Sequence, residues 1–380
     1  MSQAAAVPTS VQVAKKHSSH IAGLDGIRAI AVLLVMLSHT APGRLGLFIP
    51  AGLGVTIFFF LSGFLITTLL RREWSKTGDV SLRNFYGRRA LRILPPLYLC
   101  YAVAEIFDRV ILHTPVSTKE GFFSLLFYYF NYGYALDAYV HLHTFLPHGL
   151  SVAWSLCVEE HFYLIFPLVF LWLGRSSWPR RKQAGVLLGF CVLELAWRAT
   201  MVLTHMRGAD GWSYYATDAR LDSILWGAWL ALFANPLFQD RPLLPARLLT
   251  PAFWFAVVAL IASSALRGQL YRDAIRYSLH GVLLLAIFSF VAARQQHWVV
   301  RALETPALRY IGWISYTLYL SHYIFLEAFE AWWPQSPVAR MAATLLAAFV
   351  FSALMRFAVE TPLLRWRNRL HREPHTPEAA

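Results

Sequence analysis

Long apolar runs separated by short basic segments constrain the fold of this chain more than any other feature. A helix needs roughly 20 mostly apolar residues to cross the hydrocarbon core of a bilayer. We therefore predict an all-α membrane protein, a polytopic bundle of about ten transmembrane helices. The runs that define these spans lie at residues 24–41, 52–70, 91–112, 152–173, 184–204, 219–234, 251–267, 277–293, 311–332 and 338–359.

The charge balance is consistent with a bilayer partner. The chain has 34 Lys and Arg against 21 Asp and Glu, a formal net charge of +13. Such an excess can indicate nucleic-acid binding, but 57% of the residues are hydrophobic and only 14% are charged. In a membrane protein the excess usually marks the cytoplasmic loops. We therefore expect no nucleic-acid partner.

A ten-span topology places most basic clusters on one side of the membrane, with both termini cytoplasmic. The aromatic stretch 121–136 is treated as an extracytoplasmic re-entrant or interfacial segment, because a crossing there would move the cluster 175–182 outside. The expected location is the inner (cytoplasmic) membrane, as a multi-pass protein. The clusters placed inside are Lys15 and Lys16, residues 71–92 with seven Lys and Arg, 175–182, Arg241 and Arg247, Arg294 and Arg301, and 365–372.

This topology divides the chain into a flexible cytoplasmic N-terminus (1–20), a transmembrane domain (21–368) and a cytoplasmic tail (369–380). The cysteines Cys100, Cys157 and Cys191 lie in apolar stretches, so no disulfide framework is expected. The segments contain neither zinc-ligand spacing nor a phosphate-binding loop, and we predict no metal site.

The first span carries ionisable residues, which are costly inside a bilayer and are therefore functional candidates. Arg28 and His39 are eleven residues apart, which is three turns plus about 20° of a helix, so they share a face. Asp25 is the expected counter-ion of Arg28. A neutral imidazole there suits proton transfer. The alternatives are that His39 packs in the bundle and that Arg28 only anchors the helix.

Three arginines precede the third span within one helical turn, at positions 88, 89 and 92. Their guanidinium groups suit phosphate, which they bind bidentately. The commoner use of juxtamembrane arginines is to anchor lipid headgroups, and the residues alone favour that use.

The start of the fourth span combines Ser155, Glu159, Glu160 and His161. Two carboxylates at a membrane boundary require partners, and either could orient a catalytic imidazole. A polar cluster facing water is the alternative. Elsewhere, Glu194 with Arg198 and Arg356 with Glu360 have the i,i+4 spacing of ion pairs. His322 is either a packing residue or part of the reaction cavity, and Ser62-Gly63 is a helix-packing site.

Taken in order, several segments resemble the acyltransferase-3 family of integral membrane acyltransferases over about residues 20–368. Their residues are Leu24 to Ala29, His39, Phe59 to Ile66, Arg88 to Pro95, Trp154 to Tyr163, Arg220 to Asp222, Ser315 to His322 and Glu360 to Pro362. The resemblance implies transfer of an acyl group, commonly acetyl from acetyl-CoA, to hydroxyls of extracytoplasmic carbohydrates. Some members act on macrolides or other small molecules.

The resemblance also implies site residues. His39 matches the essential histidine of the family and Arg28 its first-span arginine. The acyl-CoA motif is implied at Arg89 and Arg92, and the acidic motif at Glu159 and Glu160. The resulting assignment is catalysis by His39, Glu159 and Glu160, and donor binding by Arg28, Arg88, Arg89 and Arg92.

Acyl-CoA is thereby expected as donor substrate, without a permanently bound cofactor. Many larger members carry a hydrolase-like domain of the SGNH type that we do not find in this sequence. Transfer is therefore expected to finish within the membrane domain or to pass to a separate extracytoplasmic partner. We expect His39 to act as general base on the acceptor hydroxyl with Glu159 orienting its imidazole, or to form an acyl-histidine intermediate. A transporter or flippase is the main alternative function, since ten spans with a polar stripe also describe a permease.

Overall fold

The computed structural model describes residues 21–113, 118–136, 146–147, 149–238, 240–333 and 336–370. These residues form helices joined by loops, and no strand occurs among them, which confirms the predicted all-helical fold. The predicted N-terminal segment 1–20 and residues 371–380 of the predicted tail lie outside the described residues.

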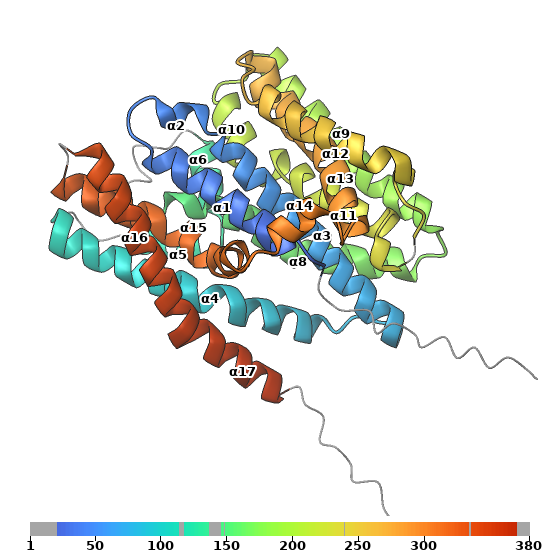
Figure 1. Cartoon of the computed structure of the whole chain (residues 1–380), viewed down its shortest axis with the longest axis horizontal. Coiled ribbons are helices and arrows are strands. Elements are labelled where there is room, and N and C mark those ends of the chain that lie inside the picture. Colours follow the sequence, from blue (N-terminus) through green and yellow to red (C-terminus); the bar gives the residue numbers. More distant parts are fainter. Residues whose placement is uncertain are drawn as a thin grey trace, which may run out of the picture.

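The elements, shown in Figure 1, include long helices, short helices and single turns of 3₁₀ or π geometry. They are α1 (Leu24–Thr40), α2 (Leu45–Phe48), α3 (Ala51–Thr77), α4 (Leu82–Phe107), η1 (Asp108–Leu112), α5 (Lys119–Leu126), α6 (Phe130–Ala135), η2 (Ser151–Ala153), α8 (Trp154–Arg175), α9 (Arg180–Leu203), α10 (Ala209–Tyr215), η3 (Thr217–Ala219), α11 (Asp222–Phe233), η4 (Pro236–Phe238), α12 (Ala246–Ser263), η5 (Tyr271–Ile275), α13 (Arg276–Ala293), α14 (Trp298–Leu303), α15 (Pro306–Trp332), α16 (Pro337–Met355), η6 (Arg356–Glu360) and α17 (Thr361–Leu370).

Helix α3 is central to the bundle and packs against both α1 and α11. Glycines make the second of these contacts close. A Cβ added at Gly63 would lie 1.9 Å from the Ile224 carbonyl oxygen, and one added at Gly227 would lie 1.9 Å from that of Phe60. The backbones of α3 and α11 therefore touch, as small residues allow between membrane helices. The prediction that Ser62-Gly63 is a packing site is confirmed for Gly63.

The remaining helices surround this centre in two groups. Helices α9, α12 and α13 gather at the upper right of the molecule in Figure 1, whereas α4, α16 and α17 lie along its lower left side. Helix α15 joins the second group to the centre, because it packs against α1, α4 and α16. The site described below lies where α1, α3, α4, α8 and α15 meet.

Seven described helical segments are long and apolar enough to cross a membrane. They are Ala51–Thr77, Leu82–Ile111, Ser151–Arg175, Arg180–Leu203, Ala246–Ser263, Tyr271–Ala293 and Pro337–Arg365. Each corresponds to one of the ten predicted spans. The other three predicted spans fall on α1, with 17 residues, on α11, with 12 residues, and on α15, which carries many polar side chains. For these three, crossing stays a prediction.

The aromatic stretch 121–136 consists of two short helices, α5 and α6, of 8 and 6 residues. The chain turns between them at Tyr128, whose φ of 56° lies in the left-handed region. Since about 20 residues are needed to cross, neither helix can span a bilayer by itself.

Candidate active site

Five helices (α1, α3, α4, α8 and α15) enclose a cavity of about 310 Å³, within the usual size range of small-molecule sites. Its wall is mostly apolar, with polar groups gathered in patches. The polar and charged lining residues are Asp25, Arg28, Ser62, Thr68, Arg72, Arg89, Arg92, Ser155, Glu159, Tyr163, Ser315, Tyr316 and Tyr319. Of the seven predicted site residues, Arg28, Arg89, Arg92 and Glu159 are among them.

Basic side chains predominate in the cavity wall, which contains four arginines and two carboxylates. Arg28 Nη1 lies 2.7 Å from Asp25 Oδ1, and Trp313 Nε1 donates to the other carboxylate oxygen at 3.0 Å. The predicted Asp25–Arg28 ion pair is therefore confirmed. The guanidinium of Arg89 lies 5.1 Å from the ring centroid of Tyr163, a cation–π distance. The excess of positive charge makes this part of the cavity suitable for an anion.

Arg88 does not share this cavity. Its Nη2 lies 3.2 Å from Glu73 Oε2 on α3, and its side chain is 38% exposed. The three guanidinium groups expected on one helical turn thus separate, and only those of Arg89 and Arg92 line the cavity.

The two predicted carboxylates also separate, because neighbouring helical positions differ by about 100° around the axis. Glu159 lines the cavity and accepts hydrogen bonds from Ser62 Oγ at 2.8 Å and from the Tyr163 hydroxyl at 3.2 Å. Glu160 is absent from the lining, and its Oε1 is buried with no hydrogen-bond partner among the described residues. Only Glu159 is placed to contact a molecule in the cavity.

His39 stands in the last turn of α1 and contacts a second histidine. Its Nδ1 lies 3.0 Å from Nε2 of His322 on α15. The ring planes are parallel within 1° and the ring centroids are 5.3 Å apart. With the two nitrogens 3.0 Å apart, the centroids can hardly be farther from each other, so the rings do not overlap face to face. The two imidazoles are therefore joined edge to edge by an N–H···N hydrogen bond. The partner of His39 is thus His322 and not Glu159, contrary to our expectation.

The histidine pair lies just beyond one end of the cavity. Neither His39 nor His322 is in the lining, but the ring of Tyr319, which is, has its centroid 5.9 Å from that of His322. The Tyr319 hydroxyl donates to the Val152 carbonyl and lies 2.8 Å from Ser155 Oγ. Tyr319 therefore lies in contact with the histidine pair and also lines the cavity.

Sequence reasoning did not assign a role in the site to Tyr163 or Tyr319, and it assigned Ser62 only to packing. Helical spacing could have pointed to the tyrosines, since Tyr163 is four residues after Glu159 and Tyr319 three before His322. Ser62 meets Glu159 across 97 residues of sequence, and no local pattern reports such a contact.

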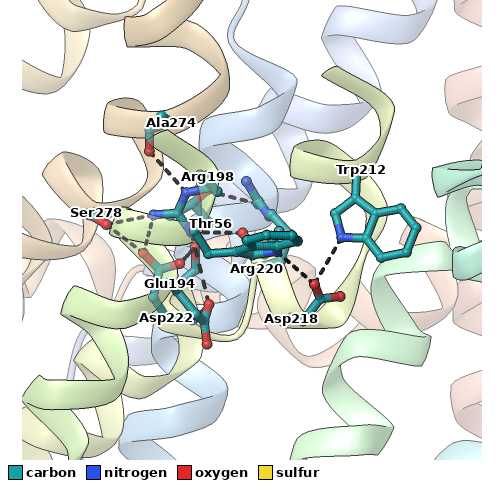
Figure 2. A network of polar contacts seen from close by, with 12 residues as sticks. Thr56, Glu194, Arg198, Trp212, Asp218, Arg220, Asp222, Ala274 and Ser278 are labelled. Carbon is teal, nitrogen blue, oxygen red and sulfur yellow. Dashed lines mark hydrogen bonds and ion pairs between the residues drawn. The ribbon is translucent and has the colours of Figure 1, made fainter. Parts of the chain in front are cut away.

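A second buried polar network, shown in Figure 2, lies between α9, α11 and α13. Arg198 is fully buried and donates to Asp222 Oδ2 at 2.6 Å, to Ser278 Oγ at 2.7 Å and to the Ala274 carbonyl at 3.0 Å. The predicted ion pair of Arg198 with Glu194 is present at 4.0 Å, and Glu194 also accepts from the backbone N–H of Asp222 at 2.7 Å. The contacts of Arg198 join three helices, which indicates a structural role for this side chain.

Comparison with known proteins identifies the family of this chain. Residues 21–357 match the acyltransferase-3 family model, described as an acyltransferase domain.

The chain belongs to the acyltransferase-3 family.

The resemblance inferred from the sequence is thereby confirmed, with its expectation of an acyltransferase domain. Among curated relatives, a candidate O-acetyltransferase of Staphylococcus aureus (strain COL) is 30% identical to this acyltransferase-3 protein over 371 residues, 93% of this chain and 60% of the relative. The peptidoglycan O-acetyltransferase OatA of Listeria monocytogenes serovar 1/2a is 30% identical over 364 residues, 90% of this chain and 56% of the relative.

A third relative, the candidate peptidoglycan O-acetyltransferase YrhL of Bacillus subtilis (strain 168), is 32% identical over 325 residues, 81% of this chain and 49% of the relative. The acyltransferase-3 chain thus spans between 49% and 60% of the length of these three proteins. No solved structure matches it. Within the described part of the chain, no three His, Cys, Asp or Glu residues are grouped so as to hold a metal ion.

Proposed function

We propose that this protein is a multi-pass O-acyltransferase of the inner membrane that moves an acyl group, acetyl in the simplest case, from acyl-CoA to a hydroxyl of an extracytoplasmic carbohydrate. One observation carries the proposal: a single cavity has arginines in its wall and, just beyond one end, a hydrogen-bonded histidine that can act as a base. Family membership supplies the class of reaction.

The donor end of the reaction is assigned to the arginines. Acyl-CoA carries several phosphates, and guanidinium groups bind phosphate bidentately. Arg28 and His39 lie on one helix about 16 Å apart along its axis, at 1.5 Å per residue. A donor held by Arg28, Arg89 and Arg92 extends its pantetheine arm along the mostly apolar cavity, and its thioester then reaches the Tyr319 end.

The chemistry follows general-base catalysis. His39 Nε2 accepts the proton of the acceptor hydroxyl, and the oxygen attacks the thioester carbonyl. Collapse of the tetrahedral intermediate breaks the C–S bond, and the departing thiolate takes the proton back from the imidazolium. A base of this kind contributes about 10²- to 10⁴-fold. An acyl-histidine intermediate differs in that the imidazole nitrogen attacks first.

The names of two relatives support a carbohydrate acceptor, since both refer to peptidoglycan. The proposed topology has ten spans and cytoplasmic termini, so that the donor enters from inside and the acceptor meets His39 from outside. The seven apolar helices support a multi-pass arrangement, and the grouping of basic segments supports the orientation. A separate extracytoplasmic protein that takes over the acyl group is compatible with this scheme.

The test uses purified protein in lipid nanodiscs with ¹⁴C-labelled acetyl-CoA and a peptidoglycan-derived oligosaccharide. The proposal requires release of free CoA thiol and an alkali-labile label on the oligosaccharide, both lost in the His39→Ala variant. Passage of the oligosaccharide across the membrane without release of CoA would establish a transporter in place of an acyltransferase.

A further inference from the structure

The environment of His322 determines which of its ring nitrogens carries a proton. His322 is fully buried in α15. Its Nδ1 lies 2.7 Å from the backbone carbonyl of Tyr319 and 3.2 Å from that of Leu318. A carbonyl oxygen only accepts hydrogen bonds, so Nδ1 must be the donor. In the neutral ring Nε2 is then left as an acceptor.

The tautomer of His322 determines that of the neighbouring ring, His39. Because His322 Nε2 accepts, the Nδ1 of His39, 3.0 Å away, must donate. A neutral imidazole has one N–H, so the lone pair of His39 is on Nε2. A free histidine prefers the opposite tautomer, with the proton on Nε2, and that form cannot accept a proton there. The Tyr319 carbonyl, His322 and His39 thus form a directed chain of hydrogen bonds that ends in a lone pair.

We propose that His322 is a positioning residue of the acyl-transfer reaction, which holds His39 in the tautomer and orientation that make Nε2 the base. This inference rests on the proposed function, in which His39 removes the acceptor proton. When His39 becomes an imidazolium, its Nδ1–H still points at the neutral His322 Nε2, so the charge forms without rearrangement of the pair. The role corresponds to that of the carboxylate in a serine-protease triad, performed here by a buried neutral ring.

The kinetic test compares two substitutions. His322→Leu removes the acceptor, so kcat should fall by about 10²- to 10⁴-fold while the KM for acetyl-CoA stays within about twofold. In His322→Gln the side-chain oxygen can take the place of Nε2, and kcat should recover to within about tenfold of wild type. Equal losses in both variants, or a loss confined to KM, would overturn the inference.

A spectroscopic readout is independent of turnover. With ¹⁵N-labelled histidine in nanodiscs, the ring nitrogens of His39 should report a protonated Nδ1 in the wild type and in His322→Gln, and a shift towards protonated Nε2 in His322→Leu. A His39 that keeps the proton on Nδ1 in His322→Leu contradicts the positioning role, whatever the activity.

Two control variants distinguish failure of the positioning role from failure of the proposed function. His280 is another buried histidine, paired with Ser263 Oγ at 2.9 Å between α12 and α13, so His280→Leu should leave the kinetics and the His39 spectrum unchanged. His39→Ala tests the proposed function itself. If this variant stays active, His39 is not the base, and His322 has no base to position. Loss of activity in His39→Ala together with full activity in His322→Leu overturns the positioning role alone.

Discussion

Nδ1 of His39 and Nε2 of His322 are 3.0 Å apart although the two residues are separated by 283 positions in the chain. The contact joins α1 to α15 immediately beyond the cavity that gathers the arginines of α1 and α4. The arginines proposed to bind the donor and the histidine proposed as the base thus lie in neighbouring parts of the structure.

Removal of the base should abolish transfer without loss of the fold. We expect His39→Ala to lower kcat by about 10²- to 10⁴-fold, the usual contribution of a general base. The measurement is release of CoA thiol in nanodiscs, with expression and thermal stability compared with wild type. A variant that stays folded and fully active excludes His39 as the base.

The structure distinguishes two arginines that are neighbours in sequence. Arg89 lines the cavity, whereas Arg88 pairs with Glu73 outside it. A hydrogen bond to a charged group contributes about 1.5–3 kcal/mol, so Arg89→Gln should raise the KM for acetyl-CoA by roughly 10- to 100-fold. Arg88→Gln should have a much smaller effect. Equal sensitivity at both positions would show that the phosphates bind elsewhere.

The carboxylates of Glu159 and Glu160 are also neighbours in sequence that differ in their position relative to the cavity. Glu159 accepts from Ser62 and Tyr163, and an amide in its place has one acceptor oxygen for the two donors. We expect Glu159→Gln to lower kcat/KM and to cost about 1–3 kcal/mol of stability. Glu160→Gln should be milder, since Glu160 is not in the cavity lining. Calorimetry measures the stability of both variants, and the transfer assay measures their kcat/KM. A larger loss of either quantity in Glu160→Gln than in Glu159→Gln contradicts the placement of Glu159 in the cavity.

The contact between α3 and α11 should tolerate no added methyl group. A Cβ at Gly63 would meet the Ile224 carbonyl at 1.9 Å, whereas nothing lies within 4 Å of one at Gly87 on α4. We expect Gly63→Ala to destabilise by about 1–3 kcal/mol or more, and Gly87→Ala to be neutral or to stabilise by about 0.5–1 kcal/mol. Thermal unfolding in detergent provides the comparison, and a Gly63→Ala protein as stable as wild type contradicts the packing described.

The orientation can be tested with single thiols, because the native cysteines are all buried. Arg44 follows α1 five residues after His39, Lys76 lies near the C-terminal end of α3, and both are exposed. In intact cells a membrane-impermeant maleimide should label Arg44→Cys, and Lys76→Cys should react only after the membrane is opened. The reverse pattern inverts the proposed topology.

Local spacing accounts for what the sequence could predict of the site. Asp25 and Arg28 are three residues apart and form the expected pair, because i,i+3 neighbours meet on any helix. The contact of His39 with His322 depends on how α1 and α15 pack, and no pattern within either helix contains that information. The separation of Glu159 from Glu160 depends likewise on the rotation of α8 within the bundle.

Prediction of the membrane spans from the sequence has a similar limit. Hydropathy predicted ten spans, and seven described helical segments have the length and composition of a membrane crossing. The other three predicted spans fall on α1 and α15, which carry the histidine pair, and on α11, which has only 12 residues. A helix buried among other helices can be short or polar because protein, and not lipid, surrounds it. Composition therefore predicts less well the two helices, α1 and α15, that carry the histidine pair.

The backbone contact of α3 with α11 also restricts how the site can change shape. Ser62, which contacts Glu159 in the cavity, is adjacent to Gly63 and is held with it against α11. That wall is rigid, since neither helix can slide past the other without a clash of backbone atoms. The part of the wall on α4 contains Pro95 and Pro96 within the helix, and α4 is much less buried than α3. Admission of a donor and release of CoA are therefore expected to involve movement of α4, with α3 and α11 as the stationary frame.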